Sequence, residues 1–448
     1  MDRTTQTIVD FAWGTRFEDL PAEVVRAAAM RVFDSIGCAL AAREVDPVRI
    51  ALASTYAVVA DGRPSGRVIG YPALRVTPES AAFLNSTMIR YLDFNDWAPN
   101  GHPSDVIGAF IALADFPGVT GERILTATVV AYEVFIGLTR ASRLPKLGWD
   151  QGFALGIATA AGVGALLGID KDALGSAIGI LAAAGVPTGA TRSGDLSMWK
   201  GAATAYAARN AVFVTMLARD GLSGPPEAFE GRRGIWPLVT GEFDLSLGDG
   251  GAFHILDTAI KPWPACYHAQ APIEAAVLLR AELGGAEAAS IDVGTYEEAW
   301  RSIASEPAKW DPQSRETADH SLPYMVARAL VDGEVTAASF RPEAYLDSGL
   351  RPLMARITAR ADEAATEAYP NDIVATLVAL DTGGKEYRID VANPLGHPAN
   401  PMSDEQLRAK FRRLTLEYLG EGSRLDAVIA DWEDIRAADS VEPLLGRL

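Results

Sequence analysis

An uncharged stretch at residues 151–167 reads Gln-Gly-Phe-Ala-Leu-Gly-Ile-Ala-Thr-Ala-Ala-Gly-Val-Gly-Ala-Leu-Leu. It is nearly long enough to span a bilayer, but alanine and glycine dominate it, and Asp170-Lys-Asp172 follows it closely. Its glycines lack the GxGxxG spacing of a dinucleotide-binding loop, and no predicted strand precedes them. We therefore expect a helix buried inside a helical domain and packed closely through its small residues.

Amphipathic helical patterns continue on both sides of this stretch. In residues 20–36, Pro21 stands at a first helical turn, and apolar residues such as Val25 and Val32 recur at helical spacing. The first part of the chain is therefore predicted to be all helix. Similar patterns cover residues 46–61, 78–92, 105–115, 121–140, 171–184, 196–220 and 272–283.

The pattern changes after Pro262-Trp-Pro264. Residues 290–296 alternate apolar and polar side chains, as a half-buried strand does. Residues 373–380 and 387–391 read as a hairpin with a glycine-bearing loop. Helical patterns lie between these strands, so we expect a smaller α+β domain here. The two helical patterns cover residues 320–331 and 351–361.

A capping box, Ser403-Asp-Glu-Gln406, opens a further helix that suits packing back on the first domain. The predicted fold is therefore mainly α, with a large discontinuous all-helical domain formed by residues 1–263 and 397–448. An α+β lid domain, residues 264–396, would be inserted into it. The cleft between the two domains is the expected ligand site.

Charge and cysteine content limit the possible partners. The 448 residues include 40 basic and 58 acidic side chains, which gives a net charge of −18. This charge disfavours nucleic acid and anionic membrane surfaces, so an anionic substrate would need a locally basic site. Two cysteines, Cys38 and Cys266, cannot form a disulfide framework, and residues 1–14 lack a signal or transit pattern. We expect a cytoplasmic protein that does not enter a membrane.

The polar stretch Asp93-Phe-Asn-Asp-Trp-Ala-Pro-Asn-Gly-His-Pro-Ser-Asp105 concentrates carboxylates and amides around His102. It is too rich in proline, glycine and asparagine for regular structure, and Ser104 or Asp105 could cap the next helix. A metal site is a weak alternative, because no second histidine or cysteine lies at ligand spacing. Spacing alone leaves two interpretations open, a solvated capped loop or an active-site loop.

Three further polar segments each join a cation or an imidazole to hydroxyl or amide groups beside a helix start. They are residues 191–201, 261–270 and 315–324. Lys200 lies near the first turn of a predicted helix, where the helix dipole prefers an anion, so an anionic ligand could lie at the same end. A structural role remains open for each residue taken singly. Together they supply cations for carboxylate groups (Lys200, Lys261, Arg192) and groups for proton transfer (His102, His268, Tyr324, Asp93).

The chain carries no nucleophile elbow, P-loop, paired CxxC motif or dinucleotide fingerprint. This argues against hydrolase, kinase and dehydrogenase activity. Acid–base chemistry on a small anion, without a cofactor, is what remains.

The order and spacing of these segments resemble the MmgE/PrpD family. The markers include Asp93-Phe-Asn-Asp96, Gly101-His-Pro-Ser-Asp105, Ser197-Met-Trp-Lys-Gly201, Tyr267-His-Ala-Gln270 and Ala318-Asp-His-Ser-Leu-Pro-Tyr324. The family includes 2-methylcitrate dehydratases, cis-aconitate decarboxylases and an iminodisuccinate epimerase. The resemblance implies an all-helical domain with an α+β lid, a homodimer, and no iron–sulfur cluster or other cofactor.

The same resemblance favours the methylcitrate dehydratase branch, whose members are hydro-lyases of propionate catabolism. Decarboxylation, epimerisation and a non-catalytic anion-binding role are the alternatives. Two positions depart from the branch pattern: Trp97 stands where Thr is usual, before a shortened loop, and Cys266 stands where Glu is usual. The candidate catalytic residues are His102, Asp93, Asp96, Lys200, His268 and Tyr324, and the candidate substrate-binding residues are Asn95, Trp97, Asp150, Arg192, Lys261, Gln270, His320 and Ser321.

Overall fold

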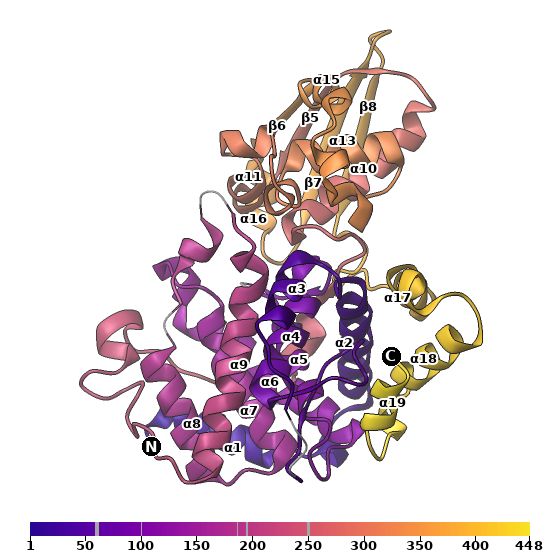
Figure 1. Cartoon of the computed structure of the whole chain (residues 1–448). Coiled ribbons are helices and arrows are strands. Elements are labelled where there is room, and N and C mark those ends of the chain that lie inside the picture. Colours follow the sequence, from indigo (N-terminus) through magenta and orange to yellow (C-terminus); the bar gives the residue numbers. More distant parts are fainter. Residues whose placement is uncertain (59–61, 100, 186, 194–195, 249–250) are drawn as a thin grey trace.

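A computed structural model describes residues 1–58, 62–99, 101–185, 187–193, 196–248 and 251–448. The described chain is mainly helical and forms two units, a larger helical unit and a smaller α+β unit beside it (Figure 1). Hydrophobic side chains form one buried cluster in each unit. Of the residues singled out from the sequence, Asn100, Gly194 and Asp195 lie outside the described ranges.

The helical unit confirms most of the predicted helices. Its α8 matches the predicted residues 171–184, whereas α1 was not predicted. The predicted helix at 46–61 is wrong over residues 54–58, because this segment runs beside a short strand, with the Val58 N–H donating to the Arg75 carbonyl at 3.0 Å. Residues 59–61 of that prediction lie outside the described ranges. The helices are α1 Arg3–Gly14, α2 Ala22–Ala41, α3 Asp46–Ala53, α4 Pro78–Tyr91, α5 Ile107–Ala112, α6 Gly121–Ser142, α7 Gly152–Leu167, α8 Lys171–Ala184 and α9 Trp199–Arg219.

The uncharged stretch is α7, packed against α6 and α9 in the centre of the unit. A Cβ atom on Gly162 would lie 2.3 Å from the Phe110 ring, and one on Gly164 would lie 2.8 Å from the Leu174 side chain. The prediction of close packing through small residues is therefore confirmed. Among the described helices, α6 is long and apolar enough to cross a membrane, but 89% of its most apolar window is buried inside the protein.

The α+β unit is built on a four-stranded sheet in the order β6-β5-β7-β8. Helix α10 packs on β7 and β8, and α13 packs on α10. The strands are β5 Ala288–Thr295, β6 Ile357–Ala361, β7 Val374–Asp381 and β8 Glu386–Ala392, and the helices are α10 Gln270–Leu283, α11 Glu297–Ile303, α12 Arg315–Ala318, α13 Leu322–Asp332, α14 Pro342–Tyr345, α15 Arg351–Met354 and α16 Glu363–Ala368.

The hairpin prediction is confirmed, since β7 pairs antiparallel with β8 and Leu377 lies opposite Ile389. The predicted helix at 351–361 is wrong in its second half. Helix α15 ends at Met354, and the residues that follow form β6, which pairs parallel with β5 through Ile291 and Ile357. This segment becomes a strand because it pairs with β5, which is far away in sequence. Local periodicity therefore could not show that it is a strand.

The C-terminal helices return to the helical unit. The predicted capping box at Ser403 is confirmed, and α17 packs on α2 with Phe411 stacked on Phe33 at a centroid distance of 4.3 Å. The C-terminal helices are α17 Asp404–Leu419, α18 Ser423–Glu433 and α19 Glu442–Gly446.

The two crossings between the units lie side by side. The Ile260 N–H donates to the Gly396 carbonyl at 3.1 Å, and a Cβ atom on Gly396 would lie 1.9 Å from the Ile260 carbonyl oxygen. Glycine is required there by both this contact and its φ of 88°. This arrangement fits an inserted unit, although the domain boundaries at 263/264 and 396/397 stay predictions.

Two short strand pairs complete the helical unit. They are β1 Gly66–Arg67 with β2 Arg75–Val76, and β3 Asp96–Trp97 with β4 Ala259–Ile260. The polar stretch at residues 93–105 is thus less irregular than expected, because β3 lies within it. Pairing of Asp96 with Ile260 brings Lys261, the residue after β4, to the same place.

Candidate active site

Asp93 is the centre of a buried cluster of cations. It follows the C-terminus of α4 with a φ of 52°, in the left-handed region that few non-glycine residues adopt. Its carboxylate lies 3.1 Å from Arg90 Nη1 and 3.3 Å from Lys200 Nζ, and it also accepts a hydrogen bond from Lys261. Burial alone would raise the pKa of Asp93, but the charges of Arg90, Lys261 and Lys200 hold it well below its ordinary value.

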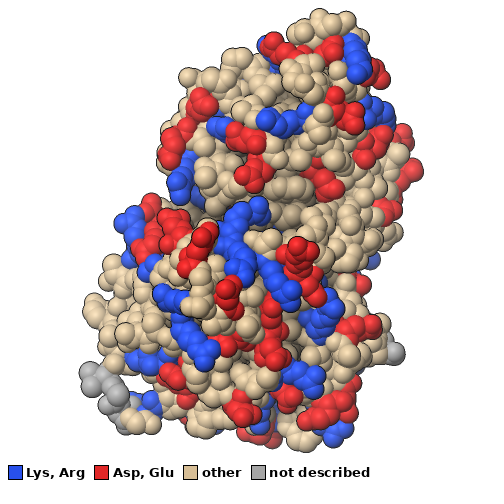
Figure 2. Space-filling model, turned by 90° about the vertical axis from the view of Figure 1, so that its right-hand side faces the viewer, with Lys and Arg blue, Asp and Glu red and all other residues tan. Residues whose placement is uncertain are grey.

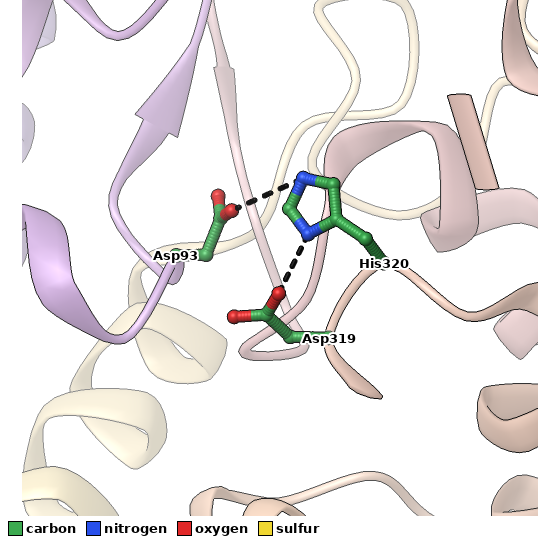
Figure 3. A group of neighbouring side chains, drawn as sticks. All are labelled: Asp93, Asp319 and His320. Atoms are coloured by element: carbon green, nitrogen blue, oxygen red, sulfur yellow. Dashed lines mark hydrogen bonds and ion pairs between the residues drawn. The ribbon is translucent and has the colours of Figure 1, made fainter. Parts of the chain in front are cut away.

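A second carboxylate, Asp319, reaches this cluster from the α+β unit. Lys200 Nζ donates to Asp319 Oδ1 at 2.9 Å, and Arg315 Nη1 lies 3.3 Å from Oδ2. His320 Nδ1 lies 2.6 Å from Asp319 Oδ1, and its Nε2 lies 3.9 Å from Asp93 (Figure 3). His320 was predicted to bind substrate, and the structure places it between the two carboxylates.

His102 faces Asp93 from the helical unit. Its Nδ1 lies 2.7 Å from the Asp96 carbonyl oxygen, which can only accept, so Nδ1 carries the proton and Nε2 has a free lone pair. That Nε2 lies 3.8 Å from Asp93 Oδ1. Burial, together with the charges of Arg90 and Lys261, lowers the pKa of His102 well below its ordinary value. A neutral imidazole with a free lone pair is suited to accept a proton.

The backbone before His102 is held tightly. The His102 N–H donates to Gln151 Oε1 at 2.8 Å, and a Cβ atom on Gly101 would lie 2.0 Å from that same oxygen. Glycine at position 101 is therefore needed for the chain to pass Gln151. This contact fixes the position of the His102 backbone.

The other polar side chains of this stretch hold the loop together. Asp96 accepts hydrogen bonds from Ser104 Oγ and Tyr132 Oη, both at 2.6 Å, so its backbone carbonyl orients His102 and its carboxylate does not. Asn95 Nδ2 donates to Ser104 and Asp105, both at 2.8 Å. The predicted helix cap at Ser104 or Asp105 is wrong, because both residues lie inside a 3₁₀ turn, Pro103–Val106. Burial raises the pKa of Asp105 to about 7.

Trp97 joins this loop to the turn after β4. Its ring stacks on Tyr267 with a centroid distance of 3.8 Å and an interplanar angle of 9°. The neighbouring His268 lies with Nδ1 2.6 Å from the Tyr296 hydroxyl, and burial lowers the pKa of His268 to about 4. Gln270 donates to the Ala265 carbonyl at 3.1 Å and holds this turn.

Asp150 and Arg192 form an ion pair beside Lys200. Arg192 Nε lies 2.7 Å from Asp150 Oδ2, and Arg192 Nη1 lies 3.5 Å from the Lys200 carbonyl oxygen. The buried Nη2 of Arg192 has no hydrogen-bond partner among the described residues. It is therefore a free donor close to the cation cluster.

Two predicted residues have their polar atoms engaged inside the α+β unit. Ser321 caps α13 by accepting from the Tyr324 N–H at 3.2 Å, and its hydroxyl donates to the Lys309 carbonyl. The buried Tyr324 hydroxyl donates to the Ser339 carbonyl. These contacts give both residues a structural role, and their roles toward a substrate stay predictions.

Sequence reasoning did not select four residues that touch this site: Arg90, Arg315, Asp319 and Cys266. A helical spacing signal was present for Arg90, three residues before Asp93, and for Arg315, four residues before Asp319. The relationship of Asp319 to Lys200 has no such signal, because it depends on the packing of the two units. Cys266 was noted in the cysteine count and as a departure from a family pattern, but not as a candidate site residue.

A metal fits this donor set poorly. Asp93, Asp319 and His320 offer ligand atoms within 4.8 Å of one another. However, Lys200 Nζ already lies 3.3 Å from Asp93 and 2.9 Å from Asp319, so it occupies the place of a cation between the carboxylates. A divalent ion would also face Arg90 and Lys261. The arrangement favours an anion at this point.

A cavity of about 800 Å³ lies at the junction of the two units, but none of the candidate site residues predicted from the sequence lines it. The expected ligand site in the cleft between the units therefore stays a prediction. Basic side chains gather at the junction of the two units, on the face that carries α17 and α18 (Figure 2). Arg315 lines the cavity and also binds Asp319, so it connects the cavity to the cluster. The arginines that line the cavity are Arg43, Arg315, Arg341 and Arg413.

Fold and site together define a family. The chain matches the MmgE/PrpD N-terminal domain over residues 6–248 and the MmgE/PrpD C-terminal domain over residues 263–434, and it belongs to the MmgE/PrpD family. It is 28% identical to the 2-methylcitrate dehydratase of Cupriavidus necator, over 92% of this chain and 90% of that protein.

Other relatives carry similar names. The 2-methylcitrate dehydratase of Escherichia coli (strain K12) is 27% identical, over 88% of this chain and 86% of that protein. The alkylcitrate dehydratase phiI of a fungal species is 28% identical, over 86% of this chain and 82% of that protein. The similarity therefore extends over both units.

Proposed function

We propose that this protein is a hydro-lyase that removes water from a small hydroxy di- or tricarboxylate, as its relatives named 2-methylcitrate dehydratase do. One observation carries the proposal. Four cations, Arg90, Lys200, Lys261 and Arg315, face three buried carboxylates, and burial raises the pKa of one of these, Asp105, to about 7. The excess positive charge, in a chain of net charge −18, suits a polyanionic substrate.

The cations would stabilise the charge that develops during the reaction. Loss of a proton from the carbon next to a carboxylate leaves an enediolate-like anion, and fixed positive charges near it lower the barrier. Lys200 and Lys261 are buried and already held in place by Asp93, so they need little reorganisation. The free Nη2 of Arg192 would bind a substrate carboxylate beside them.

His102 is the base in this proposal. Its neutral imidazole presents a free Nε2 lone pair, while the Asp96 carbonyl fixes the orientation of the ring. Asp93 would steady the protonated ring once the proton has moved, because its carboxylate lies 3.8 Å from Nε2. This assignment makes His102 the proton acceptor, and a separate group must protonate the departing hydroxyl.

The α+β unit acts as a lid in this proposal. The cluster is almost closed, with side-chain exposure of 5% for Lys200 and 11% for His102. Substrate entry therefore needs the two units to separate at the Lys200–Asp319 contact, and closure would exclude water during the reaction.

Two further proposals concern the quaternary state and the location. We propose a homodimer on the basis of family resemblance, and a cytoplasmic location because Cys38 and Cys266 are both unpaired. Light scattering after gel filtration tests the first proposal.

Incubation with a panel of hydroxy di- and tricarboxylates, including 2-methylcitrate and citrate, tests the activity. The expected result is a rise in ultraviolet absorbance as a double bond forms in conjugation with a carboxylate. Release of carbon dioxide would instead indicate decarboxylation. Deuterium uptake from solvent without loss of water would indicate epimerisation. Binding of these acids without any turnover would identify an anion-binding protein and overturn the proposal.

A further inference from the structure

The cavity at the junction of the two units is a place apart from the cluster around Asp93. Among the described residues, Arg315 alone belongs to both. The volume of about 800 Å³ lies within the range of about 300–1,000 Å³ that is usual for small-ligand pockets. The walls come from both units: the ends of α2 and α4 with one side of α17, and most of residues 335–342. A ligand in the cavity would therefore contact both units.

Apolar side chains and arginines line the cavity together. Phe94 and Phe340 contribute apolar surface. Arg341 is exposed, and its guanidinium group forms no hydrogen bond or ion pair with a described residue. The guanidinium group of Arg413 lies 3.7 Å from the Glu334 carboxylate, and with about half of each side chain exposed this ion pair contributes little. Each unit therefore presents an arginine that is available to a ligand.

Two further arginines of the lining have donors that are not used. Arg43 Nη2 lies 2.8 Å from Glu44, and its guanidinium group lies 4.1 Å from the centroid of the Tyr418 ring. Arg315 Nη1 donates to the Tyr91 carbonyl at 3.1 Å. The buried Arg43 Nε and Arg315 Nη2 have no hydrogen-bond partner among the described residues. A buried donor without an acceptor costs free energy, and an anion reached by a small rotation of the guanidinium group would offset this cost.

Three carboxylates also line the cavity, but two of them are already bound. Glu44 pairs with Arg43, and Asp46 accepts a hydrogen bond from Arg49. Glu417 has no partner among the described residues and is the one that would repel an anion. The two available arginines outweigh it, and a planar guanidinium group matches a carboxylate with paired hydrogen bonds. The cavity therefore favours an anion that carries carboxylate groups.

We propose that this cavity is a second binding site for a small di- or tricarboxylate, which arginines of both units hold away from the catalytic cluster. A ligand bound by Arg413 of the helical unit and Arg341 of the α+β unit joins the two units and favours their closed arrangement. Arg315 connects the cavity to the cluster, because its Nη1 lies 3.3 Å from Asp319 Oδ2. Under the proposed function, on which this consequence rests, substrate enters and product leaves when the units separate. The bound acid therefore slows turnover.

Calorimetry with citrate tests the site without any turnover. We expect the wild type to bind a second citrate ion besides the one at the cluster. Replacing both Arg341 and Arg413 by Met should weaken this second binding about tenfold or more, because two charged hydrogen-bond donors are lost. Glu417→Gln should strengthen it, because a repelling charge is removed. Each single replacement is measured as well, in case the double variant does not fold.

Arg412→Met is the matched control. Arg412 precedes Arg413 in α17, but it pairs with Asp426 and does not line the cavity. Its replacement should leave both citrate ions bound as in the wild type. Lys200→Met should weaken the citrate ion at the cluster and spare the one in the cavity, so that the two sites are told apart.

Turnover supplies the second readout. In an active enzyme, high concentrations of citrate should lower turnover even at saturating substrate, and the double arginine variant should need about tenfold more citrate for the same effect. Citrate binding that is identical in the wild type and the double variant would overturn this inference and leave the proposed function intact. Loss of the second citrate ion in the double variant of a chain inactive on all the acids of the panel would support the cavity site and remove the proposed function.

Discussion

Lys200 and Asp319 form a buried ion pair across the two units, with Lys200 Nζ 2.9 Å from Asp319 Oδ1. Lys200 belongs to the first turn of α9 in the helical unit, and Asp319 lies between α12 and α13 in the α+β unit. Since Lys200 also lies 3.3 Å from Asp93, one ammonium group joins the Asp93 and Asp319 carboxylates. A single residue therefore contributes to the contact between the units and to the charge that would bind substrate.

Lys200→Met should both weaken carboxylate binding and destabilise the fold. Removing one partner of a buried ion pair costs about 3–5 kcal/mol, and Arg315 keeps the loss near the lower end by remaining beside Asp319. Urea unfolding measures the stability, and calorimetry with citrate measures the binding.

Arg67→Met is a matched control for this change. Arg67 is also buried, and its ion pairs with Asp115 and Glu442 lie within the helical unit and outside the cation cluster. It should lower stability without changing the dissociation constant for citrate. Equal citrate affinity in Lys200→Met and the wild type would exclude Lys200 as a substrate clamp.

His102→Gln should lower turnover by about 10² or more, the usual contribution of a general base. Glutamine keeps a polar side chain of similar reach but cannot accept the proton. His254→Gln serves as the control, because His254 pairs with Arg140 and Asp257 away from the cluster and should be dispensable for turnover. Normal turnover in a folded His102→Gln protein would remove His102 from the mechanism.

The pH profile should have its acid limb well below 6.5, the ordinary pKa of histidine. A base works in its deprotonated form, and burial together with the charge of Arg90 lowers the pKa of His102. Arg90→Gln removes that charge and should move the acid limb to higher pH, whereas Arg90→Lys retains the charge and should leave the limb in place. An acid limb unaffected by Arg90→Gln would show that another group controls it.

The helical unit could be predicted from sequence because α7, α8 and the capping box of α17 each depend on local pattern. The strand β6 could not, since its identity depends on pairing with a strand far away in sequence. The site likewise combines residues that the sequence pattern indicates with contacts that form only between distant segments. The polar segments of the sequence singled out Lys200 and His102, but the contact between the Cys266 N–H and the Asp319 carbonyl arises only when the turn after β4 packs against the α12–α13 loop.

Stability should fall as pH is lowered from about 6.5 to 4, in part because of His268. Burial lowers the pKa of His268 from 6.5 to about 4, so in this window the unfolded chain binds a proton that the folded chain does not. The free energy of unfolding should therefore decrease with a slope of up to about 1.4 kcal/mol per pH unit from this group. His268→Gln should reduce the slope, as measured by urea unfolding at pH 7 and pH 5. An identical slope in both proteins would contradict the assignment.

Trp97→Ala should destabilise the protein and widen its substrate range. The indole is 8% exposed and stacks on Tyr267, so its removal should cost about 3–5 kcal/mol. Because Trp97 lies next to Asp96, which orients His102, and Tyr267 lies next to Cys266, the lost stack should also leave space between these two loops. Hydroxy acids with longer alkyl substituents should then gain turnover relative to citrate.

Trp13→Ala provides the comparison, because Trp13 is 61% exposed and its replacement should change stability by about 0.5 kcal/mol or less. Thermal unfolding and relative kcat/KM for a series of alkyl-substituted acids measure both effects. If Trp97→Ala lost stability but kept the substrate order of the wild type, the indole would support the fold of the loop without shaping the site, and substrate choice would have to depend on the cations around Asp93.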